Sequence, residues 1–189
     1  MTPCDLCELH KTCMTVLMSP LCPDRPRFAI YGEAPGAEED KEGEPFVGAS
    51  GRLLWDSLKD HGLSKEEAFV SHVVKCRPPD NRTPKAKEIK ACSIYLEAEL
   101  GWLKHETDCR VILALSSTAF KALGGQGSVM QAQGIPYKYK GMTVVPVLHP
   151  SAALRSPRFM EQFRAGIAAF ARAVLGEGQE HETEAVLIG

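Results

Sequence analysis

The segment between Gly32 and Gly48 carries the groups best suited to binding a small polar ring. It follows an apolar run, Phe28–Tyr31, which predicts a buried strand, and it opens with the Gly/Pro-rich sequence GEAPG. A loop at the carboxyl end of such a strand presents backbone N–H groups and side chains where open α/β proteins bind ligands. Further on, the sequence PFVG places the ring of Phe46 before a helix predicted to start at Ser50. Amides, carboxylates and one stacking ring predict a pocket for a flat polar heterocycle rather than for a phosphate.

A histidine is predicted at the same edge of the sheet. Val144–Leu148 is a second apolar run, and His149 follows it directly, at the start of the sequence HPSAALRSP. An isolated histidine is often only structural, but this one ends a strand and opens a loop of small and basic residues. Because the carboxyl ends of parallel strands meet at one edge, His149 is expected near the loop that begins at Gly32.

Composition and charge place the chain among ordinary globular proteins. It has 189 residues, of which 44% are hydrophobic and 24% charged, and a formal net charge of −2. No apolar run approaches the roughly 18–20 residues of a membrane span, and the polar, cysteine-rich start lacks the pattern of a signal peptide. We therefore expect a cytoplasmic protein with one domain over residues 1–175 and a flexible acidic tail over residues 176–189.

The seven cysteines indicate a metal site, since disulfides are rare in the cytoplasm. Cys4 and Cys7 form a C-x2-C pair, whose spacing lets two thiolates turn toward one metal centre. Cys76 at a strand end and Cys92 inside a predicted helix could complete the set. A rival set is local: Cys4, Cys7, Cys13 and Cys22. In a third interpretation Cys92 and Cys109 are merely buried apolar residues. Four thiolates suit zinc or a 4Fe–4S cluster, and residue chemistry alone does not separate the two.

A basic segment precedes and enters the longest predicted helix. Between residues 75 and 90 only Asp80 and Glu88 oppose six basic residues, which are Lys75, Arg77, Arg82, Lys85, Lys87 and Lys90. Such a group of charges can neutralise the phosphates of a nucleic acid, although a solvated helix face would have the same composition.

Apolar periodicity predicts alternating strands and helices. Strands are predicted over residues 27–31, 68–74, 110–115, 137–139 and 143–148. Helices are predicted over residues 50–61, 84–106, 117–123 and 160–175. Strands separated by helices predict a parallel sheet with helices on both faces.

Taken together, these segments resemble the uracil-DNA glycosylase superfamily, most closely its iron–sulfur family 4 enzymes. The matching sequences are GEAPGAEED (32–40), GEPFVGASGRLL (43–54), VVKCRPPDNRTP (73–84) and HPSAALR (149–155), together with Cys4, Cys7 and Cys92. The resemblance covers roughly residues 4–172, and the order and spacing of the motifs make it specific. It implies a three-layer α/β/α sandwich around a central, mostly parallel sheet of four strands.

The resemblance implies an enzyme that excises uracil from single- or double-stranded DNA and leaves an abasic site. A base inside a duplex cannot be reached, so the enzyme has to flip it into a pocket. By the family pattern, Phe46 stacks on the flipped ring, and the backbone near Glu33, Ala34 and Gly36 contacts the uracil carbonyls. Glu39 lies where family 4 enzymes crowd the C5 position, which would exclude the methyl group of thymine.

The same resemblance assigns the catalytic roles. Cleavage of the N-glycosidic bond develops negative charge on uracil O2, and His149 is placed to donate a hydrogen bond to that oxygen. A neutral imidazole still has one N–H to donate. The aspartate that positions water in the best-known uracil glycosylases corresponds to Ala34 here, so Glu33 is the nearest candidate for orienting the attacking water.

DNA contacts and a cluster are implied as well. Arg155 resembles the wedge that enters the gap left by a flipped nucleotide, and Ser151, Arg82 and Lys75 are expected to contact the DNA. The resemblance favours the split cysteine set, Cys4, Cys7, Cys76 and Cys92, as ligands of a structural 4Fe–4S cluster. It implies a monomer that binds DNA and no membrane.

One position departs from the family pattern. Family 4 members usually carry Asn directly before the VVKC sequence, where this chain has His72. An Asn amide can both accept from uracil N3–H and donate to O4, whereas one nitrogen of a neutral imidazole cannot match both groups. His72 could read uracil differently, shift the specificity toward hypoxanthine or xanthine, or reduce the activity. A non-catalytic iron–sulfur module that binds DNA or a partner protein is a further alternative.

Overall fold

The computed structural model describes residues 4–16 and 22–176 of the chain. The acidic tail predicted from residue 176 onward therefore lies outside the described residues, except for Gly176. Among the helices of the described part, none combines the length and the apolar character that crossing a membrane would require.

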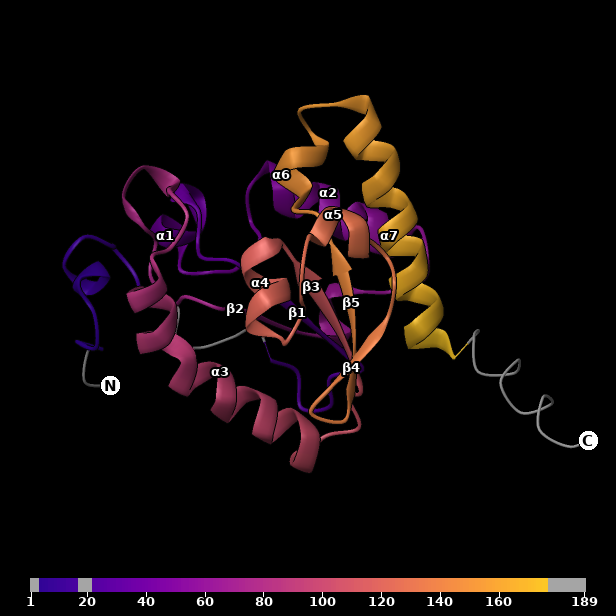
Figure 1. The fold of residues 1–189 in the computed structure, drawn as a ribbon, viewed down its shortest axis with the longest axis horizontal. Coiled ribbons are helices and arrows are strands. Elements are labelled where there is room, and N and C mark those ends of the chain that lie inside the picture. The colour runs from indigo at the N-terminus through magenta and orange to yellow at the C-terminus, as the bar shows by residue number, and fades with distance from the viewer. Residues whose placement is uncertain (1–3, 17–21, 177–189) are drawn as a thin grey trace, which may run out of the picture.

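One sheet of five strands, ordered β2-β1-β3-β5-β4, forms the centre of the fold (Figure 1). The strands are β1 Phe28–Gly32, β2 Ala68–His72, β3 Val111–Leu115, β4 Tyr137–Tyr139 and β5 Met142–Val147. All neighbours pair in parallel except β4, which runs antiparallel to β5. The predicted α/β class is confirmed, but the prediction of four strands was wrong.

The additional strand is the edge strand β4, which joins β5 through a tight hairpin. Its turn passes through Lys140 and Gly141, with φ values of 49° and 87°. Two successive residues with positive φ are characteristic of the type I′ turn, whose twist matches that of the strands it connects. The strand itself is predicted from the sequence over residues 137–139 and is present there, so only the number of strands assigned to the sheet was wrong.

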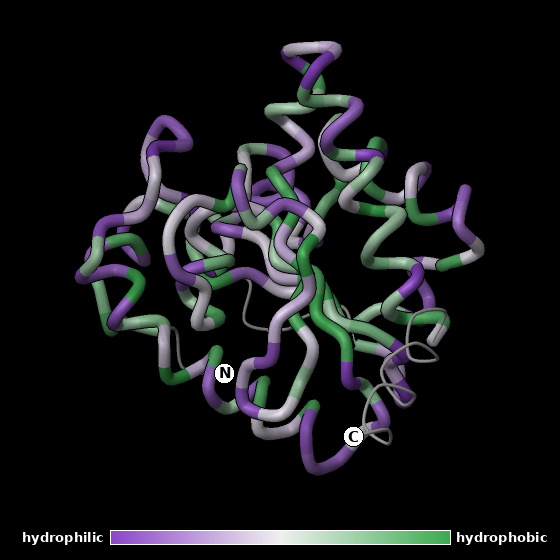
Figure 2. Tube along the Cα trace, turned by 45° about the vertical axis from the view of Figure 1, so that its right-hand side comes forward, coloured by the Kyte–Doolittle hydropathy of each residue, from purple (hydrophilic) through white to green (hydrophobic). Residues whose placement is uncertain are grey.

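The two faces of the sheet contact different helices. In β1, Ala29 and Tyr31 pack into the core on one side, while Phe28 and Ile30 pack into the core on the other. This follows from the two-residue period of a strand, which turns successive side chains to opposite faces. Figure 2 shows the resulting hydrophobic centre, with the hydrophilic segments at the periphery. The arrangement confirms three layers.

In the described part of the chain, seven α-helices accompany the sheet: α1 Ala37–Glu42, α2 Ala49–Lys59, α3 Ala86–Glu106, α4 Ser117–Ala122, α5 Val129–Ala132, α6 Pro150–Ala153 and α7 Pro157–Leu175. The same part contains three short 3-10 helices, η1 Glu8–Lys11, η2 Lys65–Glu67 and η3 Pro79–Asn81. Leucines of α3 pack on one face of the sheet, and apolar residues of α2 and α7 pack on the other. The predicted long helices are present within a few residues, whereas α1, α5 and α6 are too short for a periodic signal.

The amino-terminal segment is held to helix α1 by a buried carboxylate. Asp40, with 2% of its surface exposed, accepts the backbone N–H groups of Met14 and Thr15 through Oδ1, each at 2.9 Å. The cysteine-bearing segment and the loop after β1 are thereby joined, although they are separated in the sequence by strand β1.

Candidate active site

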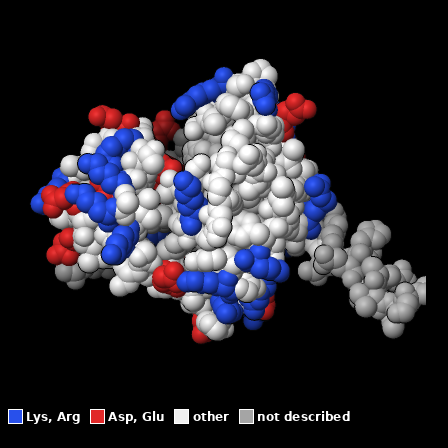
Figure 3. All heavy atoms as spheres, viewed as in Figure 1, with Lys and Arg blue, Asp and Glu red and all other residues white. Residues whose placement is uncertain are grey.

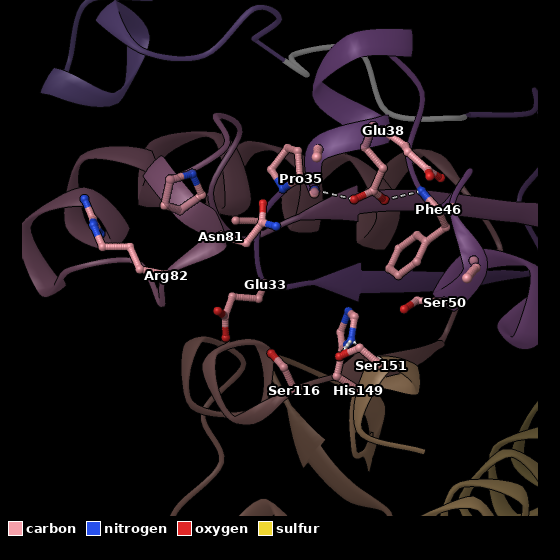
Figure 4. Close-up of a pocket in the computed structure, with 18 of the residues that line it drawn as sticks. Glu33, Pro35, Glu38, Phe46, Ser50, Asn81, Arg82, Ser116, His149 and Ser151 are labelled. Carbon is pink, nitrogen blue, oxygen red and sulfur yellow. Dashed lines mark hydrogen bonds between the residues drawn. The ribbon is translucent and has the colours of Figure 1, made fainter. Parts of the chain in front are cut away.

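A cavity of about 530 Å³ opens at the carboxyl ends of the parallel strands. Residues from the loop after β1, from the start of α2, and from the positions following β3 and β5 line it (Figure 4). The sequence-predicted residues among them are Glu33, Ala34, Gly36, Glu39, Phe46, Arg82, His149, Ser151 and Arg155. Residues from distant parts of the chain thus meet at one edge of the sheet, where open α/β folds bind their ligands.

The carboxylate of Glu39 shapes the loop after β1. One of its oxygens accepts the backbone N–H of Gly36 and the other accepts that of Phe46. Burial raises the pKa of Glu39, and these two N–H groups act in the opposite direction. The segment predicted as a loop thus contains the helix α1, and the Glu39 side chain joins the start of that helix to Phe46. Glu39 lies at the cavity wall, but both of its oxygens are already engaged.

Phe46 is fixed in place by its backbone as well as by its ring. Its φ of 54° lies in the left-handed region, and its carbonyl accepts the indole N–H of Trp55 at 3.2 Å. A Cβ added to Gly51 would lie 1.9 Å from that carbonyl oxygen, so only glycine fits there. The ring is 4% exposed and borders the cavity, with its centroid 6.5 Å from that of His149.

His72 lies against the ring of Phe46 and is not one of the residues that line the cavity. The imidazole is 3% exposed, and its Nε2 is 3.6 Å from Glu39 Oε1, which is too long for a hydrogen bond. Burial lowers the pKa of His72 to about 3, and the charges of Lys75 and His149 act in the same direction. The imidazole is therefore neutral near pH 7. In this arrangement it supports Phe46 and does not itself form the surface that a base would meet.

His149 has a defined tautomer. It caps the start of α6, where its Nδ1 accepts the backbone N–H of Ser151 at 3.2 Å and contacts the hydroxyl of Ser151 at 2.8 Å. Because Nδ1 accepts, the proton of the neutral ring is assigned to Nε2. Burial, together with a smaller effect of the positive charge of Arg155, lowers the pKa of His149 to about 4. The ring is thus a neutral donor at the cavity wall.

Glu33 is oriented by a residue that the sequence did not single out. The hydroxyl of Thr118 in α4 donates a hydrogen bond to Glu33 Oε2 at 2.6 Å. Ser116, which precedes α4 and lines the cavity, has a φ of 129°. The sequence SST predicts a helix start and nothing more, because the partner of Thr118 is 85 residues away.

The predicted DNA-contacting residues have different surroundings. Arg155 is exposed, and the neighbouring Leu154 is an apolar side chain with 51% exposure. Arg82 lies at the opposite end of the cavity from Phe46 and His149 (Figure 4), where it forms a two-point ion pair with Glu88 at 2.7 and 2.9 Å. Ser151 is engaged with His149 as described.

Lys75 does not fit its predicted DNA contact. Its side chain is 1% exposed, and the ammonium group donates to Ser71 Oγ at 2.6 Å, to the carbonyl of His72 at 2.8 Å and to Glu99 at 2.6 Å. The prediction was wrong because a lysine that neutralises a phosphate has to reach the surface. Lys75 instead joins the end of β2 to helix α3.

Five cysteines gather where the amino-terminal segment meets the first half of α3. Burial raises the pKa of Cys92, the N–H of Lys75 lowers it, and the neighbouring thiols of Cys7 and Cys4 raise it again. Burial and the nearby thiols of Cys13, Cys92 and Cys7 raise the pKa of Cys76. Cys22 is exposed and apart from this group, so the local set predicted as a rival is not assembled. Among the described residues, no three potential ligands are close enough to hold a single metal ion.

The chain belongs to the uracil DNA glycosylase superfamily, whose family model matches residues 19–171. The type-4 uracil-DNA glycosylase of Thermotoga maritima is 39% identical over 156 residues, 81% of this chain and 79% of that protein. The type-4 enzyme of Pyrobaculum aerophilum is 38% identical over 180 residues, 88% of this chain and 87% of that protein. The type-4 enzyme of Archaeoglobus fulgidus is 33% identical over 169 residues, 85% of this chain and 82% of that protein.

Proposed function

We propose that this chain is a type-4 uracil-DNA glycosylase, which hydrolyses the N-glycosidic bond between uracil and deoxyribose in DNA. One observation carries the proposal: a neutral imidazole, His149, and an aromatic ring, Phe46, border the same cavity at the strand ends. The similarity to type-4 enzymes over most of the chain supports it. The cavity volume of about 530 Å³ is ample for a single nucleotide.

The flipped base would lie against the ring of Phe46, with the edge that carries O2 toward His149. The Phe46 ring offers a flat apolar surface to a base that has lost its neighbours in the stack. Backbone groups around Ala34 and Gly36 line the same cavity and are suited to the carbonyls of uracil. Glu39 would exclude a C5 methyl group by its position, since its carboxylate is held by two backbone N–H groups and cannot readily move aside.

In the reaction, the bond between sugar C1′ and uracil N1 breaks and its electron pair leaves with the base. Negative charge then develops on uracil O2, and the Nε2–H of His149 would stabilise it by a hydrogen bond. A water molecule adds to C1′ and gives up a proton that ends on the uracil anion, which leaves the abasic sugar and neutral uracil. Glu33 is a carboxylate at the cavity that can accept a hydrogen bond from this water. No aspartate stands beside it, since the next residue is Ala34.

The DNA would lie across the mouth of the cavity. Lys and Arg side chains gather on the left of Figure 3, over the first half of α3 and the segment before it, where Lys85, Lys87 and Lys90 are exposed. Arg155, with Leu154 beside it, lies in the loop that follows His149 and would enter the gap left by the flipped nucleotide. Arg82, at the far end of the cavity, would contact the backbone of the strand.

The cysteine group fits the 4Fe–4S cluster that the family implies. All its thiols are free, Cys76 and Cys92 are buried, and the pKa of Cys92 responds to both Cys4 and Cys7. Each thiolate of such a cluster binds its own iron atom, so the four stand farther apart than the ligands of one zinc ion. We propose Cys4, Cys7, Cys76 and Cys92 as the ligands. The bound cluster would order the polypeptide near the DNA.

Two further expectations concern the location of the protein and its partners. Several free cysteines and no described disulfide support a cytoplasmic protein. The monomeric state and uracil-containing DNA as the partner follow from the proposed enzyme, which needs only its own cavity to hold the base.

The test is an excision assay on oligonucleotides that carry uracil, thymine, hypoxanthine or xanthine, single-stranded or paired, followed by alkaline strand scission. We expect scission at uracil and none at thymine. The absence of an abasic product from every oligonucleotide would refute the enzyme, and a product from hypoxanthine or xanthine alone would show that the substrate assignment is wrong.

A further inference from the structure

The carboxylate of Glu33 is held by the hydroxyl of a residue from a different element of the fold. Thr118 donates to Glu33 Oε2 at 2.6 Å, a short distance for a hydrogen bond between a hydroxyl and a carboxylate. Among the described residues, this is the one hydrogen bond that the Glu33 carboxylate makes, and no described residue donates to Oε1. The two residues come from different strand ends, since Glu33 follows β1 and Thr118 lies in the first turn of α4 after β3.

The backbone that positions Thr118 is strained. Ser116 precedes α4 with a φ of 129°, a value that residues other than glycine rarely adopt and that costs about 1–3 kcal/mol. Its N–H donates to the carbonyl of Val147 at 3.1 Å, and its hydroxyl accepts the N–H of Ala119 at 3.1 Å. These bonds hold the turn in a conformation that brings Thr118 to Glu33. Strain that neighbouring bonds maintain at a cavity wall is typical of functional sites.

We propose that Thr118 is a positioning residue: its hydroxyl fixes the Glu33 carboxylate so that Oε1 can accept a hydrogen bond from the water that attacks C1′. A carboxylate with a free side chain would sample several rotamers, and only some of them present an oxygen to the water. A hydroxyl at 2.6 Å removes that freedom before the substrate binds. This inference rests on the proposed glycosylase function and adds a residue to it.

The experiment compares three variants of the whole protein with its cluster bound. Thr118→Val keeps the shape of the side chain and removes the hydroxyl, Thr118→Ser keeps the hydroxyl, and Ser117→Ala is a matched control in the same turn, where Ser117 is exposed. For uracil excision we expect Thr118→Val to lower kcat about tenfold or more with little change in KM. Thr118→Ser and Ser117→Ala are expected to stay near the wild-type rate.

A double-mutant cycle tests whether Thr118 acts through Glu33. In a Glu33→Ala background, Thr118→Val is expected to cause no further loss, because the group that it orients is gone. A kcat for Thr118→Val close to that of the wild type, or an equal loss in both backgrounds, would overturn the proposal. Melting temperatures of all variants identify any loss that comes from unfolding.

A binding measurement separates this inference from the proposed function. A pyrrolidine analogue of the abasic sugar carries a positive charge near the position of C1′, whereas a tetrahydrofuran analogue does not. Wild-type protein is expected to bind DNA with the charged analogue more tightly, and Thr118→Val to lose part of that preference. If the wild type prefers the charged analogue and excises no base, the glycosylase proposal fails. If Thr118→Val keeps the full preference, the positioning role fails.

Discussion

The imidazole of His72 stacks on the ring of Phe46, with 5.1 Å between the ring centroids and 16° between the planes. This contact places the last residue of β2 beneath the ring proposed to stack on the flipped base. His72 thus contacts the base site through Phe46, and a change at residue 72 is expected to alter the orientation of that ring.

Gly32 makes the contact between the two rings possible. A Cβ at this position would lie 2.6 Å from His72 Cδ2 and 2.9 Å from Phe46 Cζ. Gly32→Ala is therefore expected to displace one or both rings and to lower uracil excision strongly, measured as kcat/KM. Gly101→Ala in helix α3 is the matched control, since its Cβ would meet nothing within 4 Å. That variant should keep full activity and gain about 0.5–1 kcal/mol of stability. Equal activity of the two variants would contradict the prediction.

His149 is expected to act as a neutral donor over the whole physiological pH range. Replacing it by alanine should lower kcat by roughly 10²–10³, as for the loss of one donor to a developing oxyanion, and leave DNA binding nearly unchanged. Because the pKa of His149 is lowered to about 4, the wild-type rate should not fall as the pH passes through about 6.5, the ordinary pKa of histidine. A pH–rate profile checks this, and a decrease centred near 6.5 would assign a charged His149 to the reaction.

His72 should make the protein less stable in weak acid. Its pKa is about 3 in the folded state and about 6.5 in the unfolded chain, so the unfolded state binds more protons between these values. Stability therefore falls as the pH decreases through this window, by at most about 1.4 kcal/mol per pH unit from this residue. His72→Asn is expected to reduce the slope of unfolding free energy against pH. His61→Asn, at an exposed position, is the control. If the slope of unfolding free energy against pH is the same in the wild type, His72→Asn and His61→Asn, the lowered pKa assigned to His72 is refuted.

The same His72→Asn variant reports on base recognition. Faster release of uracil would mean that the histidine limits recognition, because an asparagine amide can match both N3–H and O4 of the base. A loss of activity would instead mean that residue 72 supports uracil excision mainly by stacking on Phe46. The rates are measured on uracil and hypoxanthine substrates in parallel.

The pair formed by Lys75 and Glu99 is expected to matter for stability. Lys75→Met would leave the Glu99 carboxylate, which is 13% exposed, without its cation, at a cost of about 3–5 kcal/mol in unfolding free energy. The double variant Lys75→Met/Glu99→Leu should recover most of this loss, because no unpaired charge remains. Lys87→Met, at an exposed position of the same basic segment, should change little. The free energy of unfolding in denaturant is measured for the wild type, Lys75→Met, the double variant and Lys87→Met. A double variant no more stable than Lys75→Met would show that the unpaired Glu99 carboxylate is not the cause of the loss.

Cysteine variants identify the cluster ligands. Serine at position 4, 7, 76 or 92 should reduce the bound iron and sulfide and the brown colour of the protein, since each change removes a thiolate. Cys13→Ser is the most informative control, because Cys13 lies beside Cys76 without being a proposed ligand. Cys109→Ser is a second control. If Cys13→Ser loses its iron and Cys4→Ser keeps it, Cys13 and not Cys4 is the fourth ligand.

The common edge of Glu33, Phe46 and His149 was predictable, because strand ends follow from apolar runs and parallel strands end on the same side of a sheet. The burial of Lys75 was not, since its environment depends on Glu99, which is one of several acidic residues in helix α3. The helix α1 was not predictable either, because it is short and is stabilised by Glu39 binding back to the loop. Side chains whose partners are distant in sequence leave no local pattern to interpret.

The two hydrogen bonds from Met14 and Thr15 to Asp40 bear on the entropy that binding a cluster would cost. Cys4 and Cys7 stand only a few residues before this attachment. Because the entropy lost on closing a loop grows with the length of free chain, an attachment so near the two cysteines reduces the entropy lost when their thiolates become ligands. A carboxylate that contacts neither cysteine thus favours the arrangement of the amino-terminal segment that a cluster requires.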